Sequence, residues 1–72
     1  MQDNKNTMFY PNIRIQMANK KMTITSLAKK LDMHKNTLVL KLSGKRKFYY
    51  EEGVALSEIL DEAVDWLFKR EE

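Results

Sequence analysis

The 72-residue chain contains no cysteine and only one proline, one tryptophan and one histidine. Without cysteine it forms no disulfide and offers no thiolate to a metal, so we expect a protein suited to a reducing compartment. The single histidine has no second histidine or carboxylate at ligand spacing, and we expect no metal site and no cofactor. Because no nucleophile–base pair and no phosphate-cradling glycine loop is present, we also expect no catalytic residues, no small-molecule ligand and no enzymatic activity.

Long apolar runs are also missing. No stretch approaches the roughly 20 apolar residues that cross a bilayer, and the opening MQDNKNTMFY lacks the charged-then-apolar pattern of a secretion signal. We therefore expect a soluble, cytoplasmic protein that does not contact a membrane. A chain of 72 residues allows one small domain, which buries about 60% of its unfolded surface. Such a domain has modest stability, and pairing with another protein would not be surprising.

Charge is divided unevenly along the chain. Residues 20–47 carry nine lysines and arginines against one aspartate, a net charge of +8, whereas residues 48–72 carry eight acids against two basic residues, a net charge of −6. A protein that binds duplex DNA gathers positive charge where it meets phosphates. The sequence therefore predicts a basic face toward nucleic acid, and an acidic remainder that faces away from it or meets a basic partner.

Helical periodicity runs through most of the chain and no strand-like alternation persists, so we predict an all-α fold, a compact bundle of five helices. The predicted helices span residues 11–19, 24–31, 35–42, 50–60 and 63–68. Residues 1–10 are predicted to form a flexible tail, residues 11–69 the domain, and residues 70–72 a frayed end.

Two expectations concern aromatic and C-terminal side chains. In the last helix, Val64, Leu67 and Phe68 are expected to face inward, because they lie close together at helical spacing. Tyr49 and Tyr50 follow a basic stretch and can contact phosphate, but we expect one of them to pack in the core instead.

The segment TITSLAKKLDMHKNTLVLKLSGKR, residues 23–46, is central to the prediction. Leu27 and Leu31 mark one apolar face of its first helix. Leu38 and Leu42 mark the buried face of its second helix, again at i and i+4. The segment is thus predicted to contain two short amphipathic helices joined by a tight turn.

Residues with specific turn chemistry mark the ends of these two helices. The hydroxyl of Thr23 or Thr25 can cap the first helix by accepting a bond from an otherwise unpaired N–H. Asp32 tolerates the left-handed conformation that a turn between them requires. Either His34 or Asn36 can open the second helix.

Two helices with a tight turn, a small residue at the crossing (Ala28) and a glycine after the second helix (Gly44) form the helix-turn-helix pattern. The segment resembles the Cro/repressor helix-turn-helix proteins of temperate phages. The stretches LKLSGKRKF, EEGVALSEIL and DEAVDWLF extend the resemblance over about residues 13–68. Within that family, the length and the N-terminal tail are similar to those of modulator-of-repression proteins. The resemblance implies a lambda-repressor-like DNA-binding domain.

The resemblance also implies that the second helix of the motif lies in the major groove of double-stranded DNA. Carried over by position, the base-reading residues are Lys35, Asn36 and Val39, because lysine donates to guanine, asparagine pairs with adenine and a valine methyl touches thymine. The Thr37 methyl can pack inside instead of its hydroxyl meeting a phosphate. The predicted phosphate contacts are Lys20, Lys21, His34, Thr37, Lys45, Arg46 and Lys47.

Three departures from the family pattern bear on function. Ile24 stands where a glutamine commonly anchors the first helix of the motif, and Val39 and Leu40 stand where polar contact residues are common. Lys41 stands where an apolar residue is frequent, so we expect only its stem to pack. A partly apolar outer face argues against strong autonomous operator binding and favours a protein partner. The alternative is that Ile24 and Leu40 are covered by neighbours in the same chain.

Together, the resemblance and these departures predict a regulator of the phage lysis/lysogeny switch. It would bind its cognate phage repressor in the cytoplasm of the bacterial host and modulate that repressor's grip on operator DNA. The predicted partner-binding residues are Ile24, Lys35, Asn36, Val39 and Leu40. The alternative is an autonomous Cro-type repressor that reads operator DNA by itself, with steep salt dependence.

Overall fold

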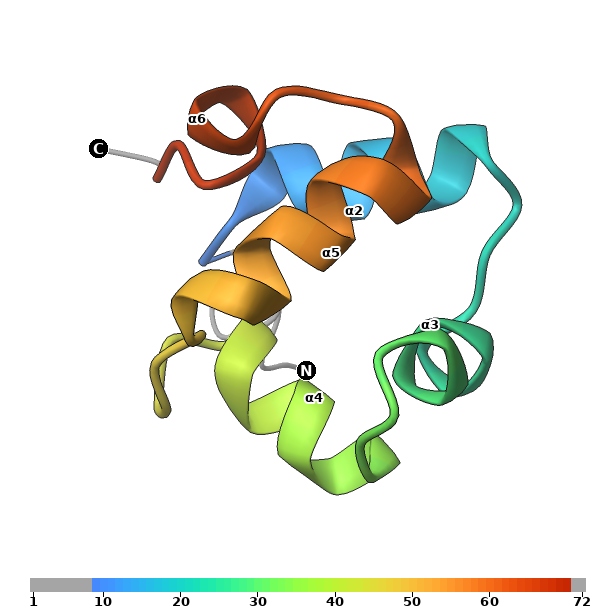
Figure 1. Ribbon diagram of the computed structural model, residues 1–72, viewed down its shortest axis with the longest axis vertical. Helices are drawn as coiled ribbons and strands as arrows, with labels where there is room; N and C mark the ends of the chain where they lie inside the picture. Colours follow the sequence, from blue (N-terminus) through green and yellow to red (C-terminus); the bar gives the residue numbers. More distant parts are fainter. Residues whose placement is uncertain (1–8, 71–72) are drawn as a thin grey trace, which may run out of the picture.

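The computed structural model describes residues 9–70, and within this range every regular element is a helix. The helices are α2 (Pro11–Asn19), α3 (Ile24–Lys30), α4 (Lys35–Leu42), α5 (Tyr50–Leu60) and α6 (Val64–Leu67) (Figure 1). The all-α prediction is confirmed, and the bounds of α2, α4 and α5 agree with those predicted. α3 ends one residue earlier than predicted, and α6 is shorter at both ends. Most of the predicted tail, residues 1–8, and the last two residues lie outside the described range.

The five helices share one apolar core. Figure 1 shows α6 at the top of the molecule, α4 at the bottom, and α2 and α5 crossing the region between them. The buried apolar residues are Ile13 and Met17 of α2, Leu27 and Ala28 of α3, Leu38 and Leu42 of α4, Leu56 and Leu60 of α5, and Leu67 of α6. In four of the helices, two buried residues lie at positions i and i+4 or i and i+1. Burying each of the large side chains stabilises the fold by about 1.5–3 kcal/mol. None of the helices in the described range is long and apolar enough to cross a membrane.

A four-residue turn, residues 31–34, joins α3 to α4. Thr23 is the N-cap of α3: its hydroxyl accepts from the Ser26 N–H at 3.1 Å, and the Ser26 hydroxyl accepts from the Thr23 N–H at 3.0 Å. Asp32 has a φ of 58°, as predicted for the turn. The Met33 N–H then donates to the Ala28 carbonyl at 3.0 Å. Figure 1 shows α3 nearly end-on while α4 runs across the view, so the two helices cross.

Two amide side chains of α2 fasten the C-terminal half of the chain. The Gln16 amide donates to the Leu60 carbonyl at 2.8 Å, and the Asn12 amide donates to the Trp66 carbonyl at 2.8 Å. Carbonyls in the last turn of a helix have no partner within that helix, and the Gln16 amide supplies one to the Leu60 carbonyl. The Trp66 carbonyl accepts the Lys69 N–H at 3.3 Å as well as the Asn12 amide. The bonds from Gln16 and Asn12 fix the ends of α5 and α6 against α2.

Two expectations about individual side chains are wrong. Tyr49 and Tyr50 are 65% and 82% exposed, and neither packs in the core, because Phe48 takes that place against the ring of Phe68 at 5.2 Å between centroids. Val64 is 41% exposed rather than inward-facing. α6 has a single turn, and within it Leu67 fills the space against the core.

Replacing Gly53 by alanine is expected to raise the free energy of unfolding by about 0.5–1 kcal/mol, because alanine loses less backbone entropy in a helix. An added Cβ would lie 3.5 Å from the Phe68 ring, which is an ordinary contact.

Replacing Gly44 by alanine is expected to lower the free energy of unfolding by about 1 kcal/mol or more. Gly44 has a φ of +82°, and its Cβ would meet the Phe9 ring at 2.7 Å. Urea denaturation measures both, and effects of the same sign would contradict this account.

Candidate nucleic-acid and partner interface

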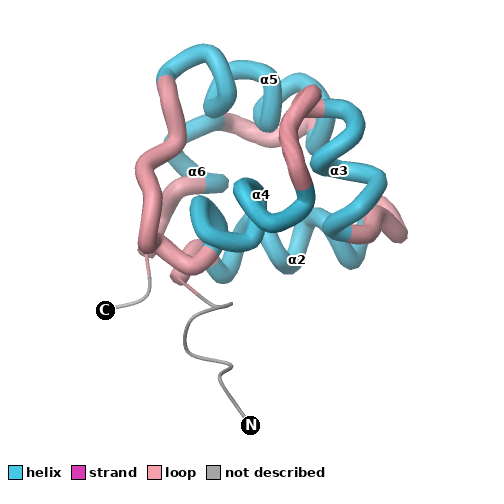
Figure 2. Tube along the Cα trace, turned by 90° about the horizontal axis from the view of Figure 1, so that it is seen from below, coloured by secondary structure: helices cyan, strands magenta, loops and turns pink. Residues whose placement is uncertain are grey.

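The outer face of α4 carries the residues that the sequence assigns to base reading and to partner binding. Figure 2 looks onto this helix, which lies at the front of the view with α3 beside it. Lys35 and Asn36 in the first turn are exposed, and Val39 and Leu40 are 39% and 36% exposed. Because Leu38 and Leu42 turn into the core, helical periodicity leaves these four side chains on the solvent side. We call Lys35, Asn36, Val39 and Leu40 the α4 face.

Three other predicted site residues border the α4 face. His34 occupies the N-cap position of α4 and is exposed, and no capping bond from its side chain occurs in the described chain. Thr37 is half-buried, so part of its side chain is covered by the fold. Ile24 begins α3, is half-buried and packs against the core. Ile24 is therefore partly covered by its own chain, whereas Leu40 stays accessible.

A small apolar depression joins α3 to the α4 face. It has a volume of about 50 Å³, and Ile24 and Val39 line it together with Arg14 and Leu42. Two predicted partner-binding residues thus meet at one place. Arg14 was missed by the sequence argument because it lies on α2, outside the basic block. Its charge beside an apolar depression adds a donor for a carboxylate or a phosphate.

The loop after α4 presents Lys45, Arg46 and Lys47 to solvent. Its start is held by the backbone: the N–H groups of Lys45 and Arg46 both donate to the Leu40 carbonyl, at 2.9 and 3.3 Å. Gly44 supplies the left-handed conformation (φ +82°) that lets the chain turn there. We call residues 45–47 the basic loop.

Lys20 and Lys21 do not join the basic loop. They form the turn after α2, where Lys21 has a φ of 55° and the Lys20 amine lies 4.0 Å from a carboxylate oxygen of Asp61. Asp61 caps the C-terminal end of α5, while the basic loop leads into its N-terminal end. An 11-residue helix is about 16 Å long, so the lysines and arginine among the predicted phosphate contacts form two separated groups.

The chain was compared with protein-family models, with curated proteins and with solved structures, and none of them matches it. Any function for the α4 face must therefore be argued from its own geometry and charge.

The burial of Lys41 differs from what the sequence predicts. Only its stem was expected to pack, but the whole residue is buried, with 4% exposed. Its amine donates to both carboxylate oxygens of Glu52, at 2.6 and 2.7 Å, and lies 4.6 Å from the centre of the Tyr49 ring. The same carboxylate accepts the Tyr49 N–H at 2.9 Å. The Lys41 charge is thus neutralised inside the fold and does not belong to the basic face.

The Glu52 carboxylate is held in its charged form. Burial raises its pKa, but hydrogen bonds from Lys41 and from the Tyr49 N–H, together with the charges of Lys41 and Arg46, outweigh burial. The pKa of Glu52 therefore lies below its usual value. A carboxyl group whose pKa is lowered by folding stabilises the fold above its unfolded pKa, and loses that contribution as pH falls through its folded pKa.

This sign predicts how the variant Glu52→Gln compares with wild type across pH. The difference in their free energies of unfolding is expected to be largest above a pH of about 4.5, where the unfolded carboxyl is also ionised, and to shrink as the solution is acidified further. Urea denaturation of both proteins at neutral pH and in acid measures this. A difference that stays constant with pH would mean that ionisation of Glu52 does not stabilise the fold.

Proposed function

We propose that this chain is a regulator of a phage lysis/lysogeny switch that acts mainly by binding its cognate repressor. Through that contact it changes the repressor's hold on operator DNA, inside the bacterial host cell. The observation that carries the proposal is the composition of the α4 face. Val39 and Leu40 stand exposed side by side there, bordered by Lys35 and Asn36.

Apolar exposure of this kind suits a protein partner better than a DNA groove. Single exposed apolar residues are common on protein surfaces. Two neighbours on one helix, next to a depression lined by Ile24 and Val39, form a small apolar centre with a polar edge. Protein–protein interfaces have this arrangement. A thymine methyl offers contact to one such side chain but does not account for both.

The proposal has a direct consequence for DNA binding by this chain. A partner that covers Val39 and Leu40 also covers Lys35 and Asn36, because all four lie on one helix face. The α4 face therefore contacts either the repressor or DNA at any moment. Sedimentation of the purified chain mixed with the repressor tests the proposal. A mixed complex supports it, and independent sedimentation at concentrations well above those of the cell overturns it.

An autonomous Cro-type operator reader is the second candidate. The exposed first turn of α4, with Lys35 and Asn36, and the basic loop favour it, since both can meet a duplex. Ile24 counts against it, because its side chain offers no hydrogen bond to anchor α3 on the DNA backbone. This candidate requires tight, sequence-selective binding by the chain alone.

The salt dependence of whatever DNA binding the chain has should depend on the basic loop. Each phosphate neutralised by a lysine or arginine adds about 0.9 to the slope of log K against log salt. Removing Lys45, Arg46 and Lys47 together by alanine substitution is therefore expected to flatten that slope by about 2–3. Fluorescence anisotropy at several salt concentrations measures it. Lys69→Ala, an exposed charge after α6, is the matched control and should leave the slope unchanged.

A further inference from the structure

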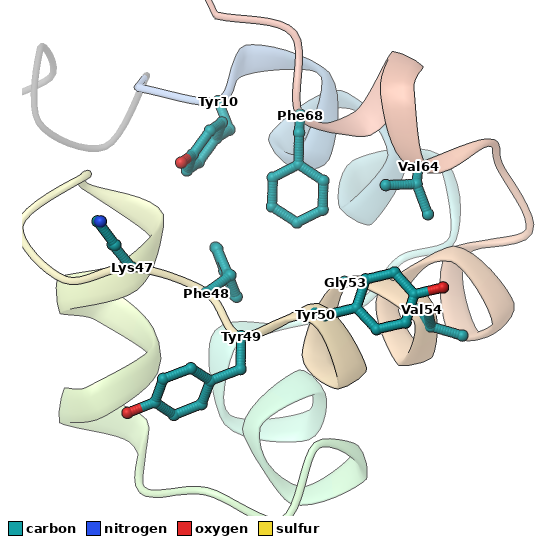
Figure 3. Close-up of a pocket in the computed structure, with 9 residues that line it drawn as sticks. All are labelled: Tyr10, Lys47, Phe48, Tyr49, Tyr50, Gly53, Val54, Val64 and Phe68. Atoms are coloured by element: carbon teal, nitrogen blue, oxygen red, sulfur yellow. The ribbon is translucent and has the colours of Figure 1, made fainter.

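A second apolar depression lies on another part of the molecule, between the basic loop, the start of α5 and α6. It has a volume of about 280 Å³ and is shown in Figure 3. We call it the α5–α6 hollow. The residues that line it are Tyr10, Lys47, Phe48, Tyr49, Tyr50, Gly53, Val54, Val64 and Phe68.

Exposed apolar surface is concentrated at this hollow. Six large apolar side chains are prominently exposed among the described residues, and Tyr49, Tyr50 and Val64 of the hollow are three of them. Val39 and Leu40 of the α4 face account for two more. A clustered apolar patch on a small domain marks an interaction site more often than scattered exposure does. The hollow therefore needs an explanation separate from that of the α4 face.

The back of the hollow is a packed aromatic wall. The rings of Tyr10, Phe48 and Phe68 contact one another, with centroids 5.2–5.9 Å apart, and in Figure 3 they point toward a common centre. Gly53 lines the hollow with its backbone, and an added Cβ there would lie 3.5 Å from the Phe68 ring. Its volume is just under the roughly 300–1,000 Å³ of small-molecule pockets, so it suits one or two protein side chains rather than a cofactor.

The two ends of the hollow differ in the sign of the charged residues near them. In the described part of the chain, Lys47 is the one charged residue among those that line it, and it continues from Lys45 and Arg46. The nearby carboxylate of Glu52 is already bound to Lys41. At the other end, the sequence neighbours of Tyr50 and Val64 are the exposed acids Glu51 and Asp65. A carboxylate on a bound segment is therefore favoured at the Lys47 end only.

We propose that the α5–α6 hollow binds a short segment of another protein, in which an aliphatic or aromatic side chain follows one or two carboxylates. The apolar side chain fills the space between Phe48, Val54 and Val64. The carboxylates lie against Lys47 and the rest of the basic loop. This site does not depend on the function proposed for the α4 face, since the two surfaces share no residue.

The test is a titration of the ¹⁵N-labelled full chain, followed by amide chemical shifts, with three blocked hexapeptides. The first is Asp-Asp-Leu-Phe-Ser-Ser, the second replaces both aspartates by lysine, and the third replaces leucine and phenylalanine by serine. The first is expected to shift the amides of Gly53, Val54 and Val64. The second and third are expected to bind at least about fivefold more weakly, since each lacks either the ion pairs or the apolar anchor.

Three variants locate the binding. Val64→Asp places a charge at the hollow and should abolish the shifts, while Lys47→Ala should weaken binding by about two- to fivefold, as expected for an exposed ion pair. Ile15→Asp introduces the same charge on α2, at an apolar residue that is 49% exposed compared with 41% for Val64, and this variant should bind the first peptide normally. An unchanged spectrum with the first peptide overturns the proposal, as does equal binding of all three. Shifts at the hollow that depend on protein concentration without peptide would instead identify a second copy of the chain as the occupant.

Discussion

Replacing Lys41 by alanine is expected to lower the free energy of unfolding by about 2–4 kcal/mol. Removing one partner of a fully buried ion pair costs about 3–5 kcal/mol, and this pair lies slightly below that range because Glu52 retains some exposure. The side chains of Lys41 and Glu52 are 5% and 20% exposed. Alanine would leave the Glu52 carboxylate without its lysine, with only the Tyr49 N–H still donating to it. A domain of this size has only about 4–11 kcal/mol of stability, so the loss is large.

The effect belongs to the pair rather than to either residue, and a double variant isolates it. Lys41→Met/Glu52→Gln removes both charges, keeps the volume, and leaves an amide oxygen to accept the Tyr49 N–H. It should lie within about 1.5 kcal/mol of wild type, since well-packed neutral replacements of buried pairs are often tolerated. Urea denaturation of Lys41→Met, Glu52→Gln and the double variant completes the cycle. Strictly additive losses would show that the two side chains do not act together.

Introducing a carboxylate at Val39 or Leu40 is expected to weaken repressor binding by at least about 30-fold, because losing an apolar anchor at the centre of an interface costs 2 kcal/mol or more. Val39→Asp and Leu40→Asp should leave stability nearly unchanged, since both side chains are already exposed. Isothermal titration calorimetry against the purified repressor measures the affinity. Circular dichroism verifies that each variant is folded.

The choice of variants follows from burial. Ile24→Asp is a poorer test, because Ile24 packs against the core and its replacement would also destabilise the fold. Ile15→Asp introduces the same charge at a residue of α2 that is 49% exposed and faces away from the core, and it should bind the repressor like wild type. If Val39→Asp, Leu40→Asp and Ile15→Asp all bind normally, the partner surface lies outside the α4 face.

The helices could be predicted from the sequence because local signals agree with tertiary packing. Leucines spaced at i and i+4 set the buried faces of α4 and α5, and the turn chemistry of Thr23, Asp32 and Gly44 sets the boundaries between α3, α4 and the basic loop. Each of these signals acts over a few residues. The bounds of α4 and α5 were therefore predicted correctly without knowledge of any long-range contact.

What the sequence did not predict depends on contacts between distant residues. Nothing local distinguishes Lys41 from the exposed lysines around it, because its burial depends on Glu52, which lies 11 residues away on another helix. The same holds for Phe48, which takes the core position expected for a tyrosine by packing against Phe68. Charge counting along the chain likewise grouped Lys20 with the basic loop, although α5 separates them.

The candidate site was predicted in part. Helical periodicity was sufficient to place Lys35, Asn36, Val39 and Leu40 on an exposed helix face, and all four are exposed. The contribution of Arg14 required the fold, because α2 brings it beside Val39 from 25 residues away in the sequence.

The most direct test of the central claim is a titration of operator DNA, taken from upstream of the chain's own gene, at low and high salt. The titration is carried out with the chain alone and then with the neighbouring repressor added. The proposed function predicts weak, salt-sensitive binding by the chain alone, and altered occupancy of the operator by the repressor when the chain is present. Val39→Asp should fail to alter that occupancy. Tight, sequence-selective binding by the chain alone, with the repressor unaffected, would contradict the proposal and identify an autonomous operator reader.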